Sequence, residues 1–290
     1  MYKVIYKEEE LKWFFDNVVP KLEDSEAHFV SLSARNKYLT DEEQKEYALG
    51  RTEMFERRIV RKNDWRRFLR TVRKFETNEG SYVTKNGMHI PSKAIVCYFN
   101  INPSDALKAY RDFNKVVNEY MYELAQCAVT KHRMDNILYR IGKMPTTLMN
   151  AYQKATGTRY WLDFDFDIDH DFLPYVKKIA EEVRTCKGRA YIIDTKGGFH
   201  LLVSKNAFDK DEDGNEKIIP LFTSTFNPKT IVDDALDEAK KFYRQKYPSD
   251  GFGLVKEFKN IEIMHNKNAM IPLPGTFQGG YGVTVLNKDV

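Results

Sequence analysis

The residues most able to do chemistry lie in one stretch, YWLDFDFDID, which runs from Tyr160 to Asp169. Acidic and bulky apolar residues alternate along it, so in a β-strand they would occupy opposite faces. The acidic face would carry Asp163, Asp165, Asp167 and Asp169. The apolar face would carry Leu162, Phe164, Phe166 and Ile168. An apolar half this bulky predicts a strand in a core, with its acidic side opening into a cleft.

Carboxylates this close together repel each other unless a positive charge lies between them. Mg²⁺ and Mn²⁺ are the usual partners, because both prefer hard oxygen ligands and often bridge substrate phosphates. The stretch therefore predicts a divalent-metal site. The alternative is an exposed edge strand whose acidic face blocks pairing with another chain.

A second candidate is the segment from Thr195 to His200, which contains Lys196, Gly197 and Gly198 and joins two apolar runs. A glycine-containing bend lets the backbone approach a ligand closely and can direct N–H groups at phosphate. Lys196 adds positive charge, and His200 would point into the same space. A lone histidine is often only a buried structural residue, but this one follows a lysine, two glycines and the carboxylate strand.

Positive charge is concentrated between residues 57 and 74, where nine Lys or Arg accompany one acid, Asp64. From a cap at Asn63 or Asp64, the spacing of Trp65, Phe68, Leu69 and Val72 predicts a helix with one apolar stripe. Five basic residues lie off that stripe: Arg66, Arg67, Arg70, Arg73 and Lys74. A face of one sign attracts polyanions, so we expect contact with nucleic acid or nucleotide phosphates. A solvated basic face is the alternative. Residues 34–38 carry two further cations. This segment is either a phosphate contact or a solvated turn.

Composition limits the class of protein. The chain has 290 residues, 42% of them hydrophobic, which is enough for one large domain or two modest lobes. It has no apolar run long enough to cross a membrane and no signal-peptide pattern, and its three cysteines are widely separated. These features predict a cytoplasmic protein with reduced thiols and no membrane partner.

Helices are expected over residues 8–22, 64–74, 104–128, 173–186 and 229–246, with two short ones between 133 and 156. Ser104 is the expected N-cap of the long helix. Strands are expected over residues 28–33, 94–99, 160–169, 190–193 and 260–264. This order predicts an α+β protein with an N-terminal α/β and helical lobe (1–130), a helical connector (131–157) and a catalytic lobe (158–290), which together could form one compact domain.

Taken together, these residues resemble the archaeo-eukaryotic primase superfamily of primase-polymerases. Its first motif is a strand with carboxylates at positions x and x+2, matched by Asp163 and Asp165. Its second ends in a histidine after a Ser/Thr/Gly-rich bend, matched by His200, with Gly198 where many members have Ser. Its third is an acidic residue on a later strand, for which Glu262 is the candidate.

Many members follow the third motif with a Pro-Gly-Thr/Ser loop, which Pro274-Gly275-Thr276 matches. The resemblance covers about residues 158–280. The chain departs from the family in two ways: Pro272 stands where members often have Arg, and no zinc module is recognisable. These departures leave open which cation holds the nucleotide and whether the chain initiates primers unaided.

The resemblance implies a catalytic core with an RRM-like mixed or antiparallel sheet, and nucleotidyl transfer on a single-stranded DNA template. Asp163, Asp165 and Glu262 would hold two Mg²⁺ or Mn²⁺ ions, with Asp167 and Asp169 nearby but not ligands. The implied nucleotide-binding residues are Thr195, Lys196, Gly198, His200, Gly275 and Thr276. The implied partners are template, primer, nucleoside triphosphates and a helicase or other replisome protein. The Lys-, Asn- and Tyr-rich composition is compatible with a virus- or plasmid-encoded protein.

Three other functions remain open from the residues alone. A glycosyltransferase also uses an Asp-x-Asp pair to hold Mn²⁺ and a nucleotide-sugar diphosphate. A metal-dependent nuclease would share the carboxylates and the basic face. A replication protein that only binds single-stranded DNA would use the basic helix, with Tyr and Trp stacking on bases.

Overall fold

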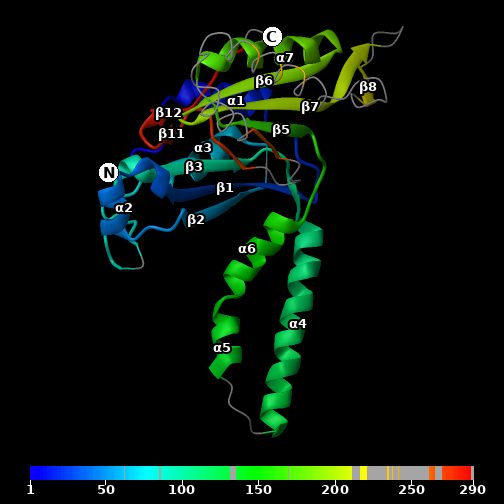
Figure 1. Cartoon of the computed structure of the whole chain (residues 1–290). Helices are drawn as coiled ribbons and strands as arrows, with labels where there is room; N and C mark the ends of the chain where they lie inside the picture. Colours follow the sequence, from blue (N-terminus) through cyan, green and yellow to red (C-terminus); the bar gives the residue numbers. More distant parts are fainter. Residues whose placement is uncertain are drawn as a thin grey trace.

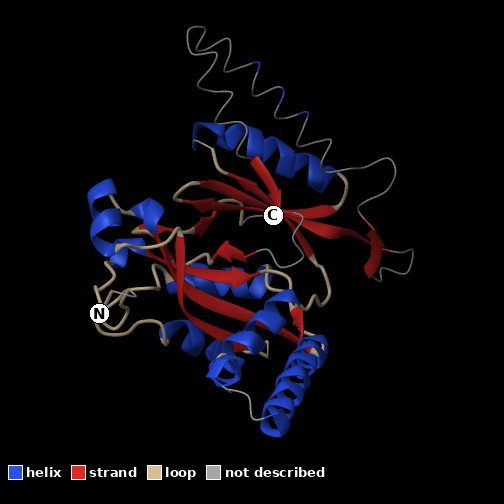
Figure 2. Cartoon of the chain, turned by 60° about the horizontal axis from the view of Figure 1, so that its bottom comes forward, coloured by secondary structure: helices blue, strands red, loops and turns tan. Residues whose placement is uncertain are grey.

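The computed structural model describes residues 1–61, 63–84, 86–130, 135–168, 170–210, 216–220, 261–264 and 270–288, together with residues 234, 237 and 241. It is an α+β protein built on two antiparallel sheets, as the sequence predicts. Figure 2 shows the two sheets as separate groups of strands. The expected helix over 229–246 and Asp169 lie outside the described residues.

The first sheet has the strand order β12-β11-β3-β1-β2, with β10 paired to β3 and β4 paired to β1. Its strands are β1 (Glu26–Arg35), β2 (Thr52–Val60), β3 (Ile95–Asn100), β4 (Ser104–Asp105), β10 (Met270–Pro272), β11 (Phe277–Gln278) and β12 (Tyr281–Gly282). Three of these strands come from the far C-terminal part of the chain. The first sheet is therefore completed by residues that follow every strand of the second one except β13.

The second sheet has the strand order β13-β6-β7-β5-β9, with β8 paired to β7. Its strands are β5 (Trp161–Phe166), β6 (Gly188–Thr195), β7 (Gly198–Lys210), β8 (Glu216–Pro220), β9 (Ile261–Met264) and β13 (Thr284–Val285). The acidic stretch is thus a strand near the middle of a sheet, with partners on both sides.

The helices are α1 (Glu8–Asn17), α2 (Asp41–Tyr47), α3 (Trp65–Arg73), α4 (Ala106–Thr130), α5 (Asp135–Gly142), α6 (Met144–Lys154) and α7 (Leu173–Thr185). In Figure 1, α4, α5 and α6 form an arm that projects away from the sheets. Residues 36–38, 92–94 and 170–172 form single 3₁₀ turns. No described helix is both long and apolar enough to cross a membrane.

Two helix ends differ from the expected ones. The first helix ends at Asn17 and not at residue 22, because Pro20 disfavours helical backbone in the residue before it. Ser104 is not the N-cap of α4, because the helix begins at Ala106 and Asp105 immediately precedes it. The cap is Asp105, whose Oδ1 accepts hydrogen bonds from the N–H groups of Leu107 and Lys108 at 2.9 and 3.0 Å.

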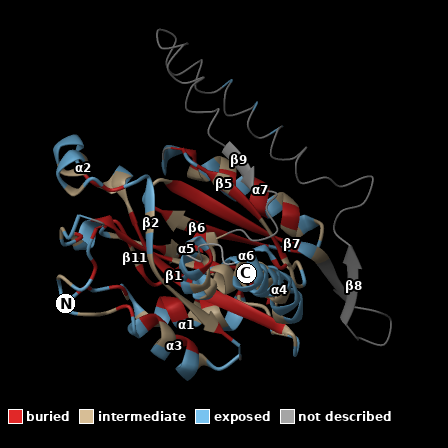
Figure 3. Cartoon of the chain, turned by 90° about the horizontal axis from the view of Figure 1, so that it is seen from below, coloured by how far each residue is buried: buried red, intermediate tan, exposed pale blue. Residues whose placement is uncertain are grey.

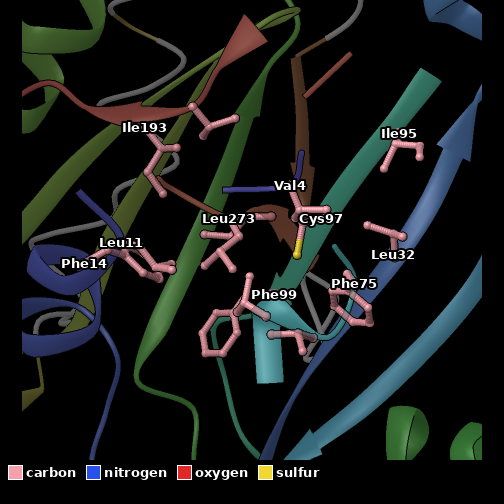
Figure 4. Packing of buried hydrophobic residues seen from close by; sticks show 14 of the residues in the cluster. Val4, Leu11, Phe14, Leu32, Phe75, Ile95, Cys97, Phe99, Ile193 and Leu273 are labelled. Atoms are coloured by element: carbon pink, nitrogen blue, oxygen red, sulfur yellow. The ribbon is translucent and has the colours of Figure 1, made fainter. Parts of the chain in front are cut away.

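Two large apolar cores hold the sheets, and a small third cluster packs Ala109 of α4 and Tyr152 of α6 against Ala27 of β1. The larger one packs α1 and α3 against the first sheet and reaches the second sheet at Ile193 and Leu202. Figure 4 shows part of it, including Phe14, Cys97 and Phe99. The smaller core packs α7 against the outer face of the second sheet, and its members include Phe164, Phe166, Val176, Ile179 and Leu201. The apolar half of the acidic strand is therefore buried, as expected, and β5 is among the buried strands in Figure 3.

A buried asparagine joins the two sheets. Asn102 follows β3 and is 2% exposed. Its Oδ1 accepts hydrogen bonds from the backbone N–H groups of Tyr160 and Trp161, both at 2.9 Å. Its Nδ2 donates to the carbonyl of Trp161, also at 2.9 Å. Because a buried amide satisfied in this way is costly to displace, the start of β5 is fixed relative to the first sheet.

His28 on β1 predicts how stability depends on pH. The ring is 1% exposed, and burial lowers its pKa from 6.5 to about 4, against the opposing effects of its hydrogen bonds to the backbone carbonyls of Asn100 and Pro20 and of the charge of Glu26. The unfolded chain therefore takes the proton first as pH falls. We expect the free energy of unfolding to drop by about 2 kcal/mol between pH 7 and pH 5 from this group.

Urea unfolding at the two pH values measures this effect. The His28→Gln variant should lack that part of the acid loss, whereas a variant of the exposed His89, His89→Gln, should keep it. An acid loss of the same size in His28→Gln and in the unmodified protein would contradict the assignment.

Candidate functional site

The register of β5 places four polar residues on one face of the second sheet. Asp165 is paired with His200 on β7 and with Glu262 on β9. Residues directly opposite each other in an antiparallel sheet lie on the same face, and Asp163 lies two residues from Asp165 on that face. The three motifs that suggested a primase-polymerase are thus adjacent in space, although Glu262 is described by its backbone alone.

Asp163 and His200 form a buried pair. Asp163 is 1% exposed and His200 is 6% exposed. The Nδ1 atom of His200 lies 2.9 Å from Oδ1 and 3.2 Å from Oδ2 of Asp163. Burial alone would lower the pKa of His200, but the charge and hydrogen bond of Asp163, helped by Asp165, raise it to about 9. The imidazole is accordingly held as a cation beside the two carboxylates.

Asp165 has a different environment from Asp163. Its Oδ1 lies 3.6 Å from the Nε2 atom of His200, and its side chain is 31% exposed. Burial raises the pKa of Asp165, and the nearby Asp163 and Asp167 raise it further, while His200 and Lys37 oppose them. A carboxylate that is partly desolvated and close to other acids gains most from a bound cation.

A pocket of about 760 Å³ opens between the two sheets, a volume within the usual range of small-molecule sites. The second sheet, the residue after β5 and the turn between β6 and β7 contribute Asp165, Asp167, Thr195, Gly197 and His200. The first sheet and its neighbouring turns contribute Arg35, Asn36, Lys37, Arg51, Thr52, Tyr98, Met270, Pro272 and Gln278. The lining from the second sheet therefore carries two carboxylates beside His200, and the lining from the first sheet carries three basic side chains.

The basic wall comes from residues that the sequence only partly indicated. Arg35 ends β1 and donates from Nη1 to the hydroxyl of Tyr98 at 2.7 Å, which fixes the guanidinium against the wall. Lys37 lies in the next turn, and Arg51 immediately precedes β2. For the polar stretch 34–38, the sequence allows either a phosphate contact or a solvated turn. Residues of this stretch line the pocket. Arg51 had no local signal, because only pairing of β2 with β1 brings it there.

The β6–β7 turn is anchored to the C-terminal strands. Lys196 donates from its backbone N–H to Oε1 of Gln278 at 2.8 Å and from Nζ to the carbonyl of Gly279 at 2.7 Å. Its Nζ also lies 4.7 Å from the ring centre of Tyr38. Lys196 is not among the residues that line the pocket, whereas its neighbour Thr195 is. Thr195 donates from Oγ1 to the carbonyl of Gly198 at 3.0 Å, which closes the turn.

Gly198 is required by packing inside the protein. Its φ is +137°, and a Cβ atom there would lie 2.1 Å from the carbonyl oxygen of Phe166. The end of β5 therefore occupies the space that a side chain would need. The sequence predicts that this glycine admits a ligand, but the group that lies close to it is the carbonyl of Phe166.

Gly275 and Thr276 lie away from this pocket. A Cβ atom on Gly275 would lie 2.5 Å from the backbone nitrogen of Leu11, and the Gly275 carbonyl accepts hydrogen bonds from Tyr6 and Lys7. Thr276 is fully buried and donates from Oγ1 to the carbonyl of Leu273 at 2.7 Å. The Pro-Gly-Thr loop thus holds the N-terminal helix, and the structure does not bring it together with Asp165 and His200.

The basic helix forms as expected, capped by Asp64, with Phe68 and Val72 buried. Phe99 packs against Phe68 of this helix, at 5.7 Å between ring centres, while the adjacent Tyr98 lines the pocket. Neighbouring residues of a strand project to opposite faces, so α3 and the pocket lie on opposite faces of the first sheet. Its basic residues, all described and exposed, are Arg66, Arg67, Arg70, Arg73 and Lys74, and none lines the pocket.

The described side chains fit a divalent ion only in part. Among them, no three His, Cys, Asp or Glu side chains converge closely enough to hold a metal. Asp165 supplies a hard oxygen donor that faces the pocket, and the backbone register pairs Glu262 with Asp165. A divalent-ion site here needs at least one acidic side chain in addition to Asp165.

Comparisons with protein-family models, with curated proteins and with solved structures gave no match to this chain.

Gly198→Ala tests the packing role of the turn glycine. We expect it to lower the free energy of unfolding by about 2–4 kcal/mol, because the added Cβ strains the backbone and collides with Phe166. The matched control is Gly142→Ala, where no atom lies within 4 Å of the added Cβ and the helix should tolerate the change. Urea unfolding measures both, and a fully stable Gly198→Ala protein with weakened nucleotide binding would point to a ligand contact instead.

Proposed function

We propose that this protein is a nucleotidyltransferase of the primase-polymerase type, which adds nucleotides to a primer on a single-stranded DNA template. The observation that carries the proposal is the pocket with two walls of opposite charge. Asp165 and Asp167 give one wall its negative charge, and Arg35, Lys37 and Arg51 give the other its positive charge. A nucleoside triphosphate with its divalent ion matches both, since it presents a cation to carboxylates and phosphate oxygens to guanidinium and ammonium groups.

Each wall has a part in the reaction. The primer 3′-oxygen attacks the α-phosphorus, a P–O bond forms, and the bond to the bridging oxygen breaks as pyrophosphate leaves. Arg35, Lys37 and Arg51 bind the triphosphate and neutralise the charge that grows on the leaving pyrophosphate. The cationic His200 faces the same space from the opposite side. Pro272 stands where members of the family often have an arginine. Arg35 supplies that cation from β1, because it lines the same pocket.

Asp165 and Glu262 are the carboxylates expected to hold Mg²⁺ or Mn²⁺, together with a further acidic residue of the stretch from Asp163 to Asp167. When bound, such an ion lowers the pKa of the attacking hydroxyl and neutralises phosphate charge. The β5–β7–β9 register supports this assignment, since it aligns the three motifs on one face. In this proposal the second sheet is the counterpart of the RRM-like catalytic sheet of the archaeo-eukaryotic primases.

The DNA has its own surface in this proposal. The exposed basic residues of α3 bind phosphates of the single-stranded template on the face of the first sheet away from the pocket. The protein would act in the cytoplasm as part of a replication system of cellular, viral or plasmid origin, where a helicase or other replisome protein supplies the single strand.

Asp165→Asn tests the catalytic assignment. Replacing the pocket-facing carboxylate should reduce primer extension by at least about a thousandfold, because the amide no longer attracts the divalent ion. The assay uses labelled primer, single-stranded template, nucleoside triphosphates and Mg²⁺ or Mn²⁺. Asp112→Asn on the exposed part of α4 is the matched control and should extend primers normally.

Other outcomes of this assay contradict the proposal in recognisable ways. Primer degradation without extension would indicate a nuclease. Binding of a UDP-sugar in preference to a nucleoside triphosphate would indicate a glycosyltransferase. Normal extension by Asp165→Asn would remove this carboxylate from the active site.

Arg67→Ala/Arg70→Ala tests the basic helix. The double variant should bind single-stranded DNA more weakly, with the slope of log K against log salt reduced by about 1.4, or about 0.7 for each lost phosphate contact. Fluorescence anisotropy with a labelled oligonucleotide measures both quantities. The affinity for a nucleoside triphosphate should stay unchanged, because α3 does not reach the pocket.

The matched control for this test removes two exposed cations from α4, Arg111→Ala/Lys115→Ala, and should leave the salt slope unchanged. Equal DNA binding by the α3 variant and the unmodified protein would assign α3 a solvated basic face.

A further inference from the structure

The three described acidic residues of the DFDFD motif have three different environments. The Asp163 side chain is fully buried and is not part of the pocket lining. The Asp165 side chain is 31% exposed and lines the pocket. Asp167 follows the end of β5, is exposed, and also lines the pocket. A metal ion that enters with its nucleotide through the pocket meets Asp165 and Asp167, whereas Asp163 lies behind them.

The oxygens of Asp163 are already engaged. Both lie within hydrogen-bond distance of the same atom, Nδ1 of His200, at 2.9 and 3.2 Å. A carboxylate accepts and does not donate, so the proton of this contact lies on Nδ1. The contact therefore fixes the ring orientation and directs Nε2 toward Asp165 and the pocket, as a carboxylate does for the histidine of many active sites.

Space for Asp167 is provided by the turn between β6 and β7. Gly197 lines the pocket, and a Cβ atom on it would lie 3.0 Å from Oδ1 of Asp167 and 3.4 Å from Nζ of Lys37. The absence of a side chain at Gly197 leaves the Asp167 carboxylate open toward the basic wall. Asp165 and Asp167 also repeat the x, x+2 spacing of Asp163 and Asp165, so the spacing alone does not distinguish the two pairs.

From these contacts we infer that Asp163 is a positioning residue, which orients His200, and that Asp165 on β5 and Asp167 just after it are the carboxylates that hold the divalent ion. This inference rests on the proposed nucleotidyltransferase function. It differs from what the family resemblance implies for two residues. Asp163 is not a metal ligand, and Asp167 is one.

Under this assignment, metal binding and the orientation of His200 depend on different aspartates. Loss of Asp165 or Asp167 removes a donor from the ion. Loss of Asp163 leaves the ion in place but releases the His200 ring, which then meets the triphosphate in the wrong orientation. Asp163→Asn keeps an acceptor oxygen for Nδ1–H, whereas Asp163→Ala keeps none, so the two variants should differ.

Binding of Mn²⁺ alone, followed by electron paramagnetic resonance, is the first readout. Asp165→Asn and Asp167→Asn should each weaken Mn²⁺ binding by about tenfold or more, because each removes a charged oxygen ligand. Asp163→Asn should change it by less than about threefold, since that residue is not a ligand. In primer extension, Asp163→Ala should lose substantially more kcat than Asp163→Asn, which would not follow if both merely removed a metal ligand.

The His200 ring gives a second readout on the unmodified protein. In ¹⁵N-histidine-labelled protein, with the signal assigned by its loss in His200→Gln, the Nδ1–H resonance should persist when Mg²⁺ is added. If Asp163 were a ligand, the ion would take its oxygens and the resonance would shift or vanish. This measurement keeps the inference testable even if the Asp163 variants fail to fold.

The possible results separate the inference from the proposed function. If the unmodified protein binds Mn²⁺ and extends primers, but Asp163→Asn loses Mn²⁺ as severely as Asp165→Asn, the positioning role is wrong and the function stands. Unchanged Mn²⁺ binding in Asp167→Asn would also overturn the inference. If the unmodified protein neither binds Mn²⁺ nor extends primers, both the function and the inference fail.

Discussion

The pairing of β5 with β7 on one side and β9 on the other is the constraint on which the rest of the site depends. It sets Asp165 between His200 and Glu262 and directs Phe164 and Phe166 into the core beneath α7. A slip of one residue would turn the carboxylates into that core and the phenylalanines into the pocket. Burial of two phenylalanine side chains contributes roughly 3–6 kcal/mol, so the apolar half of the strand fixes the position of the acidic half.

The second requirement is that the two sheets face each other at a fixed distance, because the basic wall belongs to the first sheet. Asn102 and the backbone of Tyr160 and Trp161 join the sheets at one end of β5. The turn contacts of Lys196 with Gln278 and Gly279 join them at the other. Both connections link segments that are far apart in the sequence, so the charge arrangement in the pocket depends on the whole fold.

The sequence predicts features set by local patterns and misses those set by long-range pairing. Alternation over residues 160–169 predicts the strand and both of its faces, although β5 ends at Phe166, and the apolar spacing predicts α3 with a cap at Asn63 or Asp64. The side of the sheet on which α3 lies does not follow from its own residues, because it depends on which face Phe99 presents. Arg51 gives no local signal for the same reason. Gly198 and Gly275 show that a glycine in a motif can be explained by a neighbouring backbone or helix as well as by a ligand.

The most direct test of the central claim is a crystal structure with Mn²⁺ and a non-hydrolysable nucleoside triphosphate. The account predicts an anomalous Mn²⁺ signal beside Asp165 on the β5 face, and triphosphate oxygens in contact with Arg35, Lys37 and Arg51. A nucleotide or Mn²⁺ bound outside this pocket, with Asp165 and the basic wall free of ligand, would contradict it.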